Sequence, residues 1–350
     1  ATAALSMWIS NTATTVMMLP IALSLIAVIL PPDSELGRDR ANFGGAMMLG
    51  VAYAASIGGM ATLIGSPPNA LAASYLEQTF QVQISFAEWM AIALPITAPM
   101  LILAYLTLTR LTFPFSKSLA GTETHIVADM LRDMGPVSAP EKRVAIVFTA
   151  VSAAWIFHPL YGDRIGVSLT DTGIAVAGAI ALFVIPADWR NRLFLLDLAT
   201  ARKAPFDILI LFGGGLSLAH AIDSSGLDTW IGNGLSFLHG THLFLLIAAT
   251  VLLVVFATEL MSNTATAAAF LPIAGSLAMG AEIAALPIVV AVGLAASCAF
   301  MLPVATLPNA LVYGTGQVAL PQMLRAGFML SLIGAAVIAA GIVFAVQFLP

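Results

Sequence analysis

A short polar motif occurs twice in the sequence, each time at the start of a long apolar run. Each copy reads Ser-Asn-Thr-Ala-Thr, and Leu-Pro-Ile-Ala follows after four variable residues. The residues of the two triplets are Ser10, Asn11 and Thr12 in the first copy and Ser262, Asn263 and Thr264 in the second. Hydroxyl and carboxamide groups donate hydrogen bonds to anions and also offer oxygen atoms to hard cations. Agreement at this density marks an internal repeat.

A second pair of motifs follows the first pair. Residues 65–69 read Gly-Ser-Pro-Pro-Asn, and residues 305–309 read Ala-Thr-Leu-Pro-Asn. A hydroxyl residue also stands four positions before each triplet, Ser6 in the first copy and Thr258 in the second. Each half of the chain therefore has two polar interruptions within apolar sequence. This pattern is typical of the midplane binding site of an inverted-repeat transporter.

The polar motifs stand where helices are expected to begin. Ser, Asn and Thr are good N-cap residues, and Pro is tolerated in the first turn of a helix. Where such helices begin near the middle of a membrane, their unpaired N–H groups and positive dipole ends face a cavity. Several of these ends together predict an anion site that has no cationic side chain.

The absence of basic residues from the apolar spans predicts a coupling ion. No Lys or Arg lies within the spans that the sequence indicates, and a multiply charged anion is costly to dehydrate. A cation is therefore expected to accompany the anion. Unwound backbone carbonyls, together with Ser, Thr and Asn oxygens, suit a hard monovalent cation, and Na⁺ is the predicted coupling ion.

The composition is that of a membrane protein. Apolar residues make up 60% of the 350 residues and charged residues only 9%. The single cysteine, Cys298, excludes a disulfide framework and a multi-cysteine metal site. The spans contain no paired Ser/His, Asp/Asp or His-Glu-x-x-His arrangement, so the chain is not expected to be an enzyme. The lipid bilayer is an expected partner, and nucleic acid is not.

These motifs require particular elements to position them. The predicted fold is an all-α polytopic membrane protein, an inverted-repeat transporter with two re-entrant helical hairpins and two broken transmembrane helices. The breaks are expected at residues 57–69 and 305–309, where Gly and Pro interrupt apolar sequence. The predicted divisions are first-repeat transport elements at 1–109, a connection at 110–143, scaffold-type spans at 144–222 with an interfacial amphipathic helix at 188–203, and second-repeat transport elements at 223–350. A short amphipathic helix is expected at 123–133.

The basic residues predict an orientation in the membrane. If each triplet lies at the tip of a re-entrant hairpin, twelve of the 13 Lys and Arg residues fall on one face and only Arg164 on the other. This is a strong positive-inside distribution. The chain is therefore expected to be a multi-pass protein of the cell (inner or plasma) membrane, with the loop 110–143 in the cytoplasm.

Taken together, the motifs resemble the divalent anion/sodium symporter family, which contains transporters of dicarboxylates, citrate and sulfate. The resemblance is carried by the two triplets, by Ile-Gly-Gly at 57–59 with Gly-Ser-Pro-Pro-Asn, by Phe-Gly-Gly-Gly-Leu-Ser-Leu at 212–218, and by Pro-Val-Ala-Thr at 303–306. It covers essentially the whole chain. The chain begins without Met, close to the first motif, so we expect that the scaffold helices that precede this motif in the family are missing. One departure is Leu307, where the family often has Pro.

The resemblance implies a set of site residues. The substrate carboxylates would be held by Ser10, Asn11, Thr12, Ser262, Asn263 and Thr264, with Thr306 nearby. One Na⁺ site would use Ser6, Ser10, Asn11 and the carbonyl of Gly59. The other would use Thr258, Asn263 and the carbonyls of Met261 and Ala305. The resemblance also implies a homodimer and an elevator movement of the transport elements against a scaffold.

The predicted function is therefore secondary active transport. The preferred hypothesis is Na⁺-coupled symport of a di- or tricarboxylate such as succinate, malate or citrate. A dicarboxylate exchanger and a sodium/sulfate symporter are alternatives within the class, and an anion channel is an alternative from another class. Glu259 is an acidic residue deep in apolar sequence, for which a hydrogen bond inside the hairpin and the handling of a proton or cation are both open.

Overall fold

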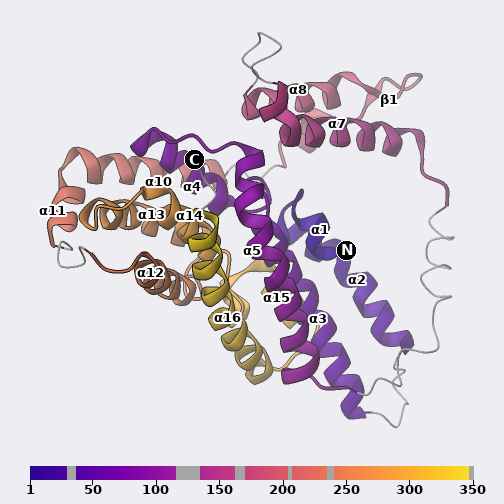
Figure 1. Cartoon of the computed structure of the whole chain (residues 1–350). Coiled ribbons are helices and arrows are strands. Elements are labelled where there is room, and N and C mark those ends of the chain that lie inside the picture. The colour runs from indigo at the N-terminus through magenta and orange to yellow at the C-terminus, as the bar shows by residue number, and fades with distance from the viewer. Residues whose placement is uncertain (30–36, 116–134, 162–169, 204–206, 235–239, 347–350) are drawn as a thin grey trace. The chain divides into compact units, whose positions relative to one another are not determined.

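Figure 1 shows the computed structural model of the chain, which describes residues 1–29, 37–115, 135–161, 170–203, 207–234 and 240–346. The described chain is mostly helical, as predicted. It divides into two compact units, residues 1–84, 89–119 and 208–350 in the first and residues 85–88 and 120–207 in the second. Each unit is described by itself.

Helices of the length and composition of membrane spans are present. Four helical stretches within the described residues are long and apolar enough to cross a bilayer, at Asn11–Ile29, Asp39–Met60, Phe86–Thr112 and Leu320–Ala345. Shorter apolar helices lie at Asp171–Val184, Leu209–Ile222, Leu243–Ala257 and Ala285–Ala295. These helices agree with the predicted all-α membrane protein.

The first part of unit 1 contains a helix that is interrupted as predicted. Its elements are α1 (Thr2–Ser6), α2 (Asn11–Ile29), α3 (Gly37–Met60), α4 (Pro67–Phe80) and α5 (Phe86–Leu106), which continues as a π-helical segment at Thr107–Thr112. The non-helical residues 61–66 between α3 and α4 are called the first break below. Two prolines in the first turn of α4 fix where the helix resumes, because Pro lacks the N–H that an earlier turn would need.

The second part of unit 1 contains a longer interruption than predicted. Its elements are α10 (Asp207–Ser224), α11 (Leu227–Gly234), α12 (Leu243–Ala257), α13 (Asn263–Gly280), α14 (Ala285–Ala295), a 3₁₀ turn (Pro303–Ala305), α15 (Leu307–Gly314) and α16 (Leu320–Val346). The break predicted at 305–309 begins earlier in the structure, because α14 ends at Ala295. Residues 296–306 form the second break. Side chains from elsewhere in the fold, described below, hold this apolar stretch out of the helical conformation.

The helices that follow the two triplets pack in a matching way. Helix α2 lies against α3, which precedes the first break, and against α15, which follows the second break. Helix α13 lies against α14, which precedes the second break, and against α4, which follows the first break. Each triplet therefore begins a helix that touches both interrupted segments of unit 1.

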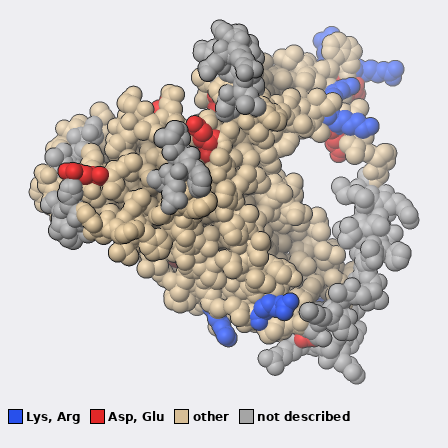
Figure 2. All heavy atoms as spheres, viewed as in Figure 1, with Lys and Arg blue, Asp and Glu red and all other residues tan. Residues whose placement is uncertain are grey.

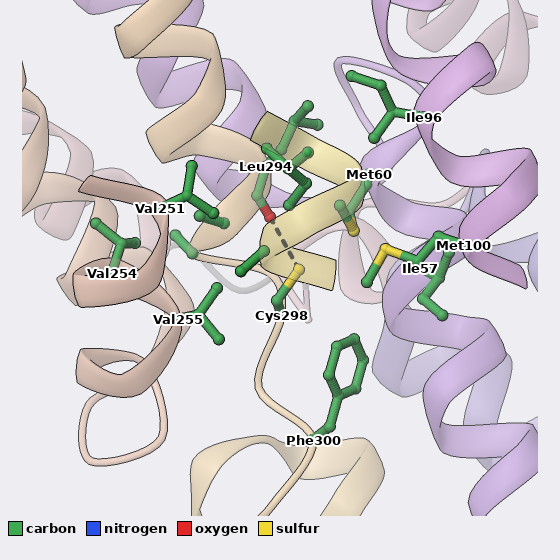
Figure 3. Close-up of a cluster of buried hydrophobic side chains, with 14 of the residues drawn as sticks. Ile57, Met60, Ile96, Met100, Val251, Val254, Val255, Leu294, Cys298 and Phe300 are labelled. Atoms are coloured by element: carbon green, nitrogen blue, oxygen red, sulfur yellow. Dashed lines mark hydrogen bonds between the residues drawn. The ribbon is translucent and has the colours of Figure 1, made fainter. Parts of the chain in front are cut away.

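An apolar core supports the second break. Cys298 lies among side chains from α3, α5 and α12, including Met60, Met100 and Val255 (Figure 3). The Cys298 thiol is fully buried and donates a weak hydrogen bond to the Leu294 carbonyl, with 3.6 Å between sulfur and oxygen. This environment is that of a packed thiol.

Unit 2 is built on a pair of helices, α7 (Ala139–Tyr161) and α8 (Asp171–Val184). The two helices approach closely at Gly178, where a Cβ atom would stand 2.5 Å from a methyl group of Val151. Trp155 donates from Nε1 to the Asp171 carbonyl at 2.9 Å. It also stacks, with ring centres 5.0 Å apart, on Phe86, which belongs to unit 2 although most of α5 lies in unit 1. Thr170 caps α8 by accepting the Gly173 N–H.

The predicted interfacial helix at 188–203 is wrong. This segment forms a short antiparallel hairpin of β1 (Pro186–Asp188) and β2 (Leu193–Phe194), followed by a single helical turn, α9 (Leu198–Ala201). The Asp188 carboxylate accepts hydrogen bonds from the Asn191 side chain and from the N–H groups of Arg190 and Asn191, and these bonds lower the pKa of Asp188. Arg192 adopts a left-handed conformation, with φ of 52°. Turn formation by Asp188 therefore overrides the amphipathic pattern.

The predicted helix at 123–133 lies outside the described residues. The functional division at 109, 143 and 222 remains a prediction. By its contacts, most of α10 belongs to unit 1.

Candidate functional site

The first triplet begins α2. Ser10 is exposed, and its hydroxyl accepts the N–H of Ala13 at 3.3 Å, so it caps the helix as predicted. Asn11 and Thr12 are half-buried. The N-terminal N–H groups of α2 therefore stand beside polar side chains that solvent reaches in part.

The carboxamide of Asn11 is surrounded by oxygen atoms. One of its terminal atoms lies 2.7 Å from Ser6 Oγ, 3.0 Å from the Ala55 carbonyl oxygen and 3.3 Å from the Gly65 carbonyl oxygen. If this atom is Nδ2, its two hydrogens are shared among these three oxygens. If it is Oδ1, four oxygens converge and only the Ser6 hydroxyl can donate, which is an arrangement that suits a hard cation. We call this group the first oxygen cluster.

Glycines permit this close approach. A Cβ atom on Gly59 would stand 2.2 Å from Asn11 Oδ1 and 2.9 Å from the Gly65 carbonyl oxygen. A Cβ atom on Gly65 would stand 2.5 Å from the Gly59 carbonyl oxygen. The structure therefore places the backbone of Gly59 beside Asn11, with Ser6 and Gly65 close to the same carboxamide. A cation site at these residues stays a prediction. The exposed hydroxyl of Ser10 is used by the helix cap.

The second triplet begins α13 in the same manner. Ser262 is exposed, and its hydroxyl accepts the N–H of Ala265 at 3.2 Å. Asn263 and Thr264 are half-buried. This cap matches the cap of the first triplet atom for atom.

A second polar group forms beside the second triplet. The buried Thr258 hydroxyl lies 3.1 Å from Asn263 Oδ1 and donates to the Ala296 carbonyl oxygen at 2.8 Å. We call these residues the second oxygen cluster. Met261 is 41% exposed and Ala305 is 5% exposed. Within the described residues, no hydrogen bond joins Met261 or Ala305 to Thr258 or Asn263.

Asn69 and Asn309, in the first turns of the helices that follow the two breaks, make equivalent hydrogen bonds that were not predicted from the sequence. Asn69 Nδ2 donates to the carbonyls of Gly59 and Thr62, at 2.9 and 2.7 Å. Asn309 Nδ2 donates to the carbonyls of Ala299 and Leu302, both at 3.1 Å. In both halves the acceptors lie 10 and 7 residues before the asparagine. The Pro-Asn pair that occurs in both halves, at 68–69 and 308–309, was the sequence signal that could have indicated these hydrogen bonds.

Glu259 holds the second break. The residue is 3% exposed, and its carboxylate accepts the N–H groups of Phe300, Met301 and Leu302 at 2.7, 2.8 and 3.1 Å. Tyr53 donates to the Phe300 carbonyl at 2.7 Å. Hydrogen bonds to a charged group are among the stronger ones in proteins. The Glu259 carboxylate therefore bonds the second break. One of the two predicted uses was a hydrogen bond inside its own hairpin, and these three bonds go to the break instead.

Thr306 caps the helix after the second break. Its hydroxyl accepts the Asn309 N–H at 3.2 Å, and its side chain is half-buried. Leu307 is the first residue of α15 and is 65% exposed. The helix start at Thr306 therefore forms with Leu at position 307, which was noted above as a departure from the family pattern.

Several buried oxygens in this region have no hydrogen-bond partner among the described residues. They are Thr14 Oγ1 and Thr266 Oγ1, at matching positions after the two triplets, and Asn69 Oδ1 and Asn309 Oδ1, at matching positions in the first turns of α4 and α15. Unpaired buried oxygens are uncommon and are explained in many proteins by water or an ion. Their positions add Thr14 and Thr266 to the polar residues that surround the two triplets.

Acidic and basic side chains contribute little else to this region. Among the described residues, no group of three or more His, Cys, Asp and Glu side chains is placed to hold a metal ion. Uncharged residues make up most of the face of the molecule seen in Figure 2. The chemistry available near the triplets is therefore that of hydroxyls, carboxamides, carbonyls and helix N-termini.

Known proteins show clear similarity to this chain. The family model for the sodium:sulfate symporter transmembrane region matches residues 1–348. The sodium-dependent dicarboxylate transporter of Staphylococcus saprophyticus is 36% identical over 352 residues, which cover 99% of this chain and 68% of the relative. The protein of the same name from Staphylococcus aureus strain USA300 is 36% identical over 344 residues, 97% of this chain and 66% of the relative. The chain thus spans about two thirds of the length of these relatives.

Proposed function

Because the chain belongs to the sodium:sulfate symporter family, we propose that it carries a dicarboxylate across a membrane together with Na⁺. The family and these relatives are transporters, which confirms the prediction that the chain is not an enzyme. The family and the apolar helices also confirm a multi-pass membrane protein. The observation that carries the proposal is the pair of matching capped triplets, each beside a buried cluster of oxygens.

The substrate is held by uncharged donors in this proposal. Helices α2 and α13 begin at the triplets, and α4 and α15 begin at the breaks. Each helix N-terminus offers about half a positive charge, and the first turns of α2 and α13, which contain no Pro, also offer backbone N–H groups. The substrate carboxylates would bind the exposed or half-buried side chains of Ser10, Asn11, Thr12, Ser262, Asn263, Thr264 and Thr306.

Two Na⁺ ions would neutralise the dianion. The first oxygen cluster supports one site, at Ser6, Asn11 and Gly59, with Gly65 as a further oxygen donor. The second oxygen cluster supports the other, at Thr258 and Asn263, completed by carbonyls of Met261 and Ala305. Oxygen donors without a fixed carboxylate suit a hard monovalent cation. Ser10 would join the first site through its hydroxyl only after leaving its capping position.

The inverted repeat and the two re-entrant hairpins are part of the proposal. They are supported by the equal spacing of the Asn69 and Asn309 hydrogen bonds and by the matching helix contacts of α2 and α13. The family resemblance further suggests an elevator movement and a homodimer. The distribution of Lys and Arg supports a cytoplasmic position for the loop 110–143.

Uptake by the purified full chain tests this function. Proteoliposomes loaded with K⁺ would be given radiolabelled succinate outside, with Na⁺, K⁺ or choline as the external cation. The expected result is uptake in Na⁺ alone, with competition by malate stronger than by sulfate. Uptake that is equal in all three cations would contradict Na⁺ coupling, and stronger competition by sulfate would favour the sulfate symporter. Counterflow of succinate without any cation gradient would favour the exchanger.

A further inference from the structure

Two buried hydroxyl groups join the two breaks directly. Ser66 Oγ lies 2.9 Å from Ser297 Oγ, and the two residues are 1% and 0% exposed. Ser66 is the last residue of the first break, and Ser297 is the second residue of the second break. The hydrogen bond therefore connects segments that are 231 residues apart in the chain.

The peptide bond that precedes each of these residues contributes its carbonyl oxygen to an oxygen cluster. The Gly65 carbonyl, which belongs to the peptide bond before Ser66, lies 3.3 Å from the Asn11 carboxamide. The Ala296 carbonyl, which belongs to the peptide bond before Ser297, accepts the Thr258 hydroxyl at 2.8 Å. A continuous series of contacts thus runs from the first oxygen cluster to the second, and its central link is the Ser66–Ser297 bond.

The internal repeat does not account for this bond. The backbone of Ser66 (φ −142°, ψ 136°) is nearly the same as that of its counterpart Thr306 (φ −144°, ψ 152°). Thr306 caps its helix, whereas the Ser66 side chain makes no cap hydrogen bond. The counterpart of Ser297 is Ile57, which has no polar group. One half of the repeat has therefore lost a helix cap, which ordinarily stabilises the helix, and has a buried cross-link instead.

We propose that Ser66 and Ser297 are positioning residues that couple the two cation sites, so that Na⁺ at one site raises the affinity for Na⁺ at the other. This inference rests on the proposed function. A cation in the first cluster fixes the Gly65 carbonyl and, with it, the orientation of Ser66. The hydroxyl bond carries this restraint to the peptide unit that presents the Ala296 carbonyl to Thr258. Because coupling between two sites is reciprocal, the same bond acts in the opposite direction.

The test is a double-mutant cycle on the Na⁺ dependence of transport. Succinate uptake by the full chain in proteoliposomes is measured over a range of Na⁺ concentrations for the unchanged protein, Ser66→Ala, Ser297→Ala and the double variant. We expect a sigmoidal curve for the unchanged protein. Each single variant should give a less sigmoidal curve and a half-saturating Na⁺ concentration raised about two- to tenfold, the range of one neutral hydrogen bond. The double variant should lie no further from the unchanged protein than the single variants do.

Matched variants separate coupling from a general loss of packing. Ser66→Thr keeps a hydroxyl and should keep the sigmoidal curve. Ser276→Ala removes another fully buried hydroxyl, and it should also keep the sigmoidal curve. Among the described residues this hydroxyl bonds only its own helix, at the Pro272 carbonyl. If an alanine variant does not fold, Ser66→Cys, with its weak donor, replaces it in the comparison with Ser66→Thr.

The possible failures are distinguishable. If the unchanged protein needs no Na⁺, the proposed function fails and this inference falls with it. If uptake needs Na⁺ but the unchanged curve is hyperbolic, or the alanine variants keep its shape and midpoint, the coupling alone is overturned. Additive effects in the double variant would also overturn it, because the two hydroxyls would then act independently.

Discussion

At the scale of single residues, the two oxygen clusters differ in what brings backbone carbonyls close to the Asn11 and Asn263 side chains. In the first cluster, Gly59 and Gly65 let backbone carbonyls approach the Asn11 carboxamide without a Cβ atom between them. At the matching positions the second half has Ala299 and Ala305, both of which carry a Cβ atom. The second cluster relies instead on the Thr258 hydroxyl, which bridges Asn263 and the second break. Only the first cluster should therefore depend on glycine.

This difference predicts the effect of Gly59→Ala. The added methyl group would stand 2.2 Å from Asn11 Oδ1, so either the carboxamide or the break must move and the cluster opens. We expect the half-saturating Na⁺ concentration for succinate uptake to rise by about tenfold or more, a loss of roughly 1.4 kcal/mol or more in binding. The curve of initial uptake rate against Na⁺ concentration measures this.

Gly50→Ala is the matched control, because Gly50 lies in the same helix and a Cβ atom there meets nothing within 4 Å. It should leave the Na⁺ dependence unchanged. Equal effects of the two substitutions would show that helix flexibility, rather than the cluster, determines the response.

At the scale of the elements, the apolar helices and the first break could be predicted from the sequence, but the second break could be predicted only in part and the segment 188–203 was predicted wrongly. Gly58, Gly59 and two prolines indicate the first break locally. Residues 296–302 are mostly apolar and contain no Gly or Pro, so nothing local ends α14 at Ala295. The helix ends there because Glu259, Tyr53 and Asn309, which are distant in sequence, satisfy the backbone groups of the break. Such partners are visible only in the folded chain.

Glu259→Gln should therefore loosen the second break. In the unchanged protein the carboxylate accepts three backbone N–H groups. The substitution removes the charge and replaces one accepting oxygen by an NH₂ group, so at least one of these backbone N–H groups loses its acceptor. Hydrogen bonds to a charged group contribute about 1.5–3 kcal/mol each, so the free energy of unfolding should fall by about 2 kcal/mol or more. Denaturant unfolding of the detergent-solubilised protein measures the change, and succinate uptake should fall in parallel.

Met7→Gln provides the comparison in the other half of the repeat. Met7 matches Glu259 in position, but its backbone carbonyl, not its side chain, accepts the Thr62 hydroxyl. A new side chain at Met7 should leave that bond in place and change stability much less. A loss of stability as large as that of Glu259→Gln would refute the special role of the carboxylate.

At the scale of the whole molecule, the sequence predicts how the chain crosses the membrane, and the native thiol makes this prediction easy to test. Basic residues gather in loops that the hairpin topology places on one face, including the loop 110–143. In this topology the loop between α4 and α5 lies on the opposite face. Cys298 is fully buried, so it should give little background with a thiol reagent. Two single cysteines can therefore report the two faces.

Gln83→Cys and Ser138→Cys are suitable positions, because both side chains are exposed and lie in polar loops. A membrane-impermeant maleimide added to intact cells should label Gln83→Cys and leave Ser138→Cys unlabelled until the membrane is opened. Among the described residues, α5 with its continuation to Thr112 is the apolar helix that separates the two positions, so labelling from opposite sides requires that this helix crosses the membrane. The side on which each cysteine reacts then tests the orientation that the Lys and Arg residues predict. Labelling of both cysteines from outside would mean that α5 does not cross, and labelling of Ser138→Cys alone would mean that the predicted orientation is reversed.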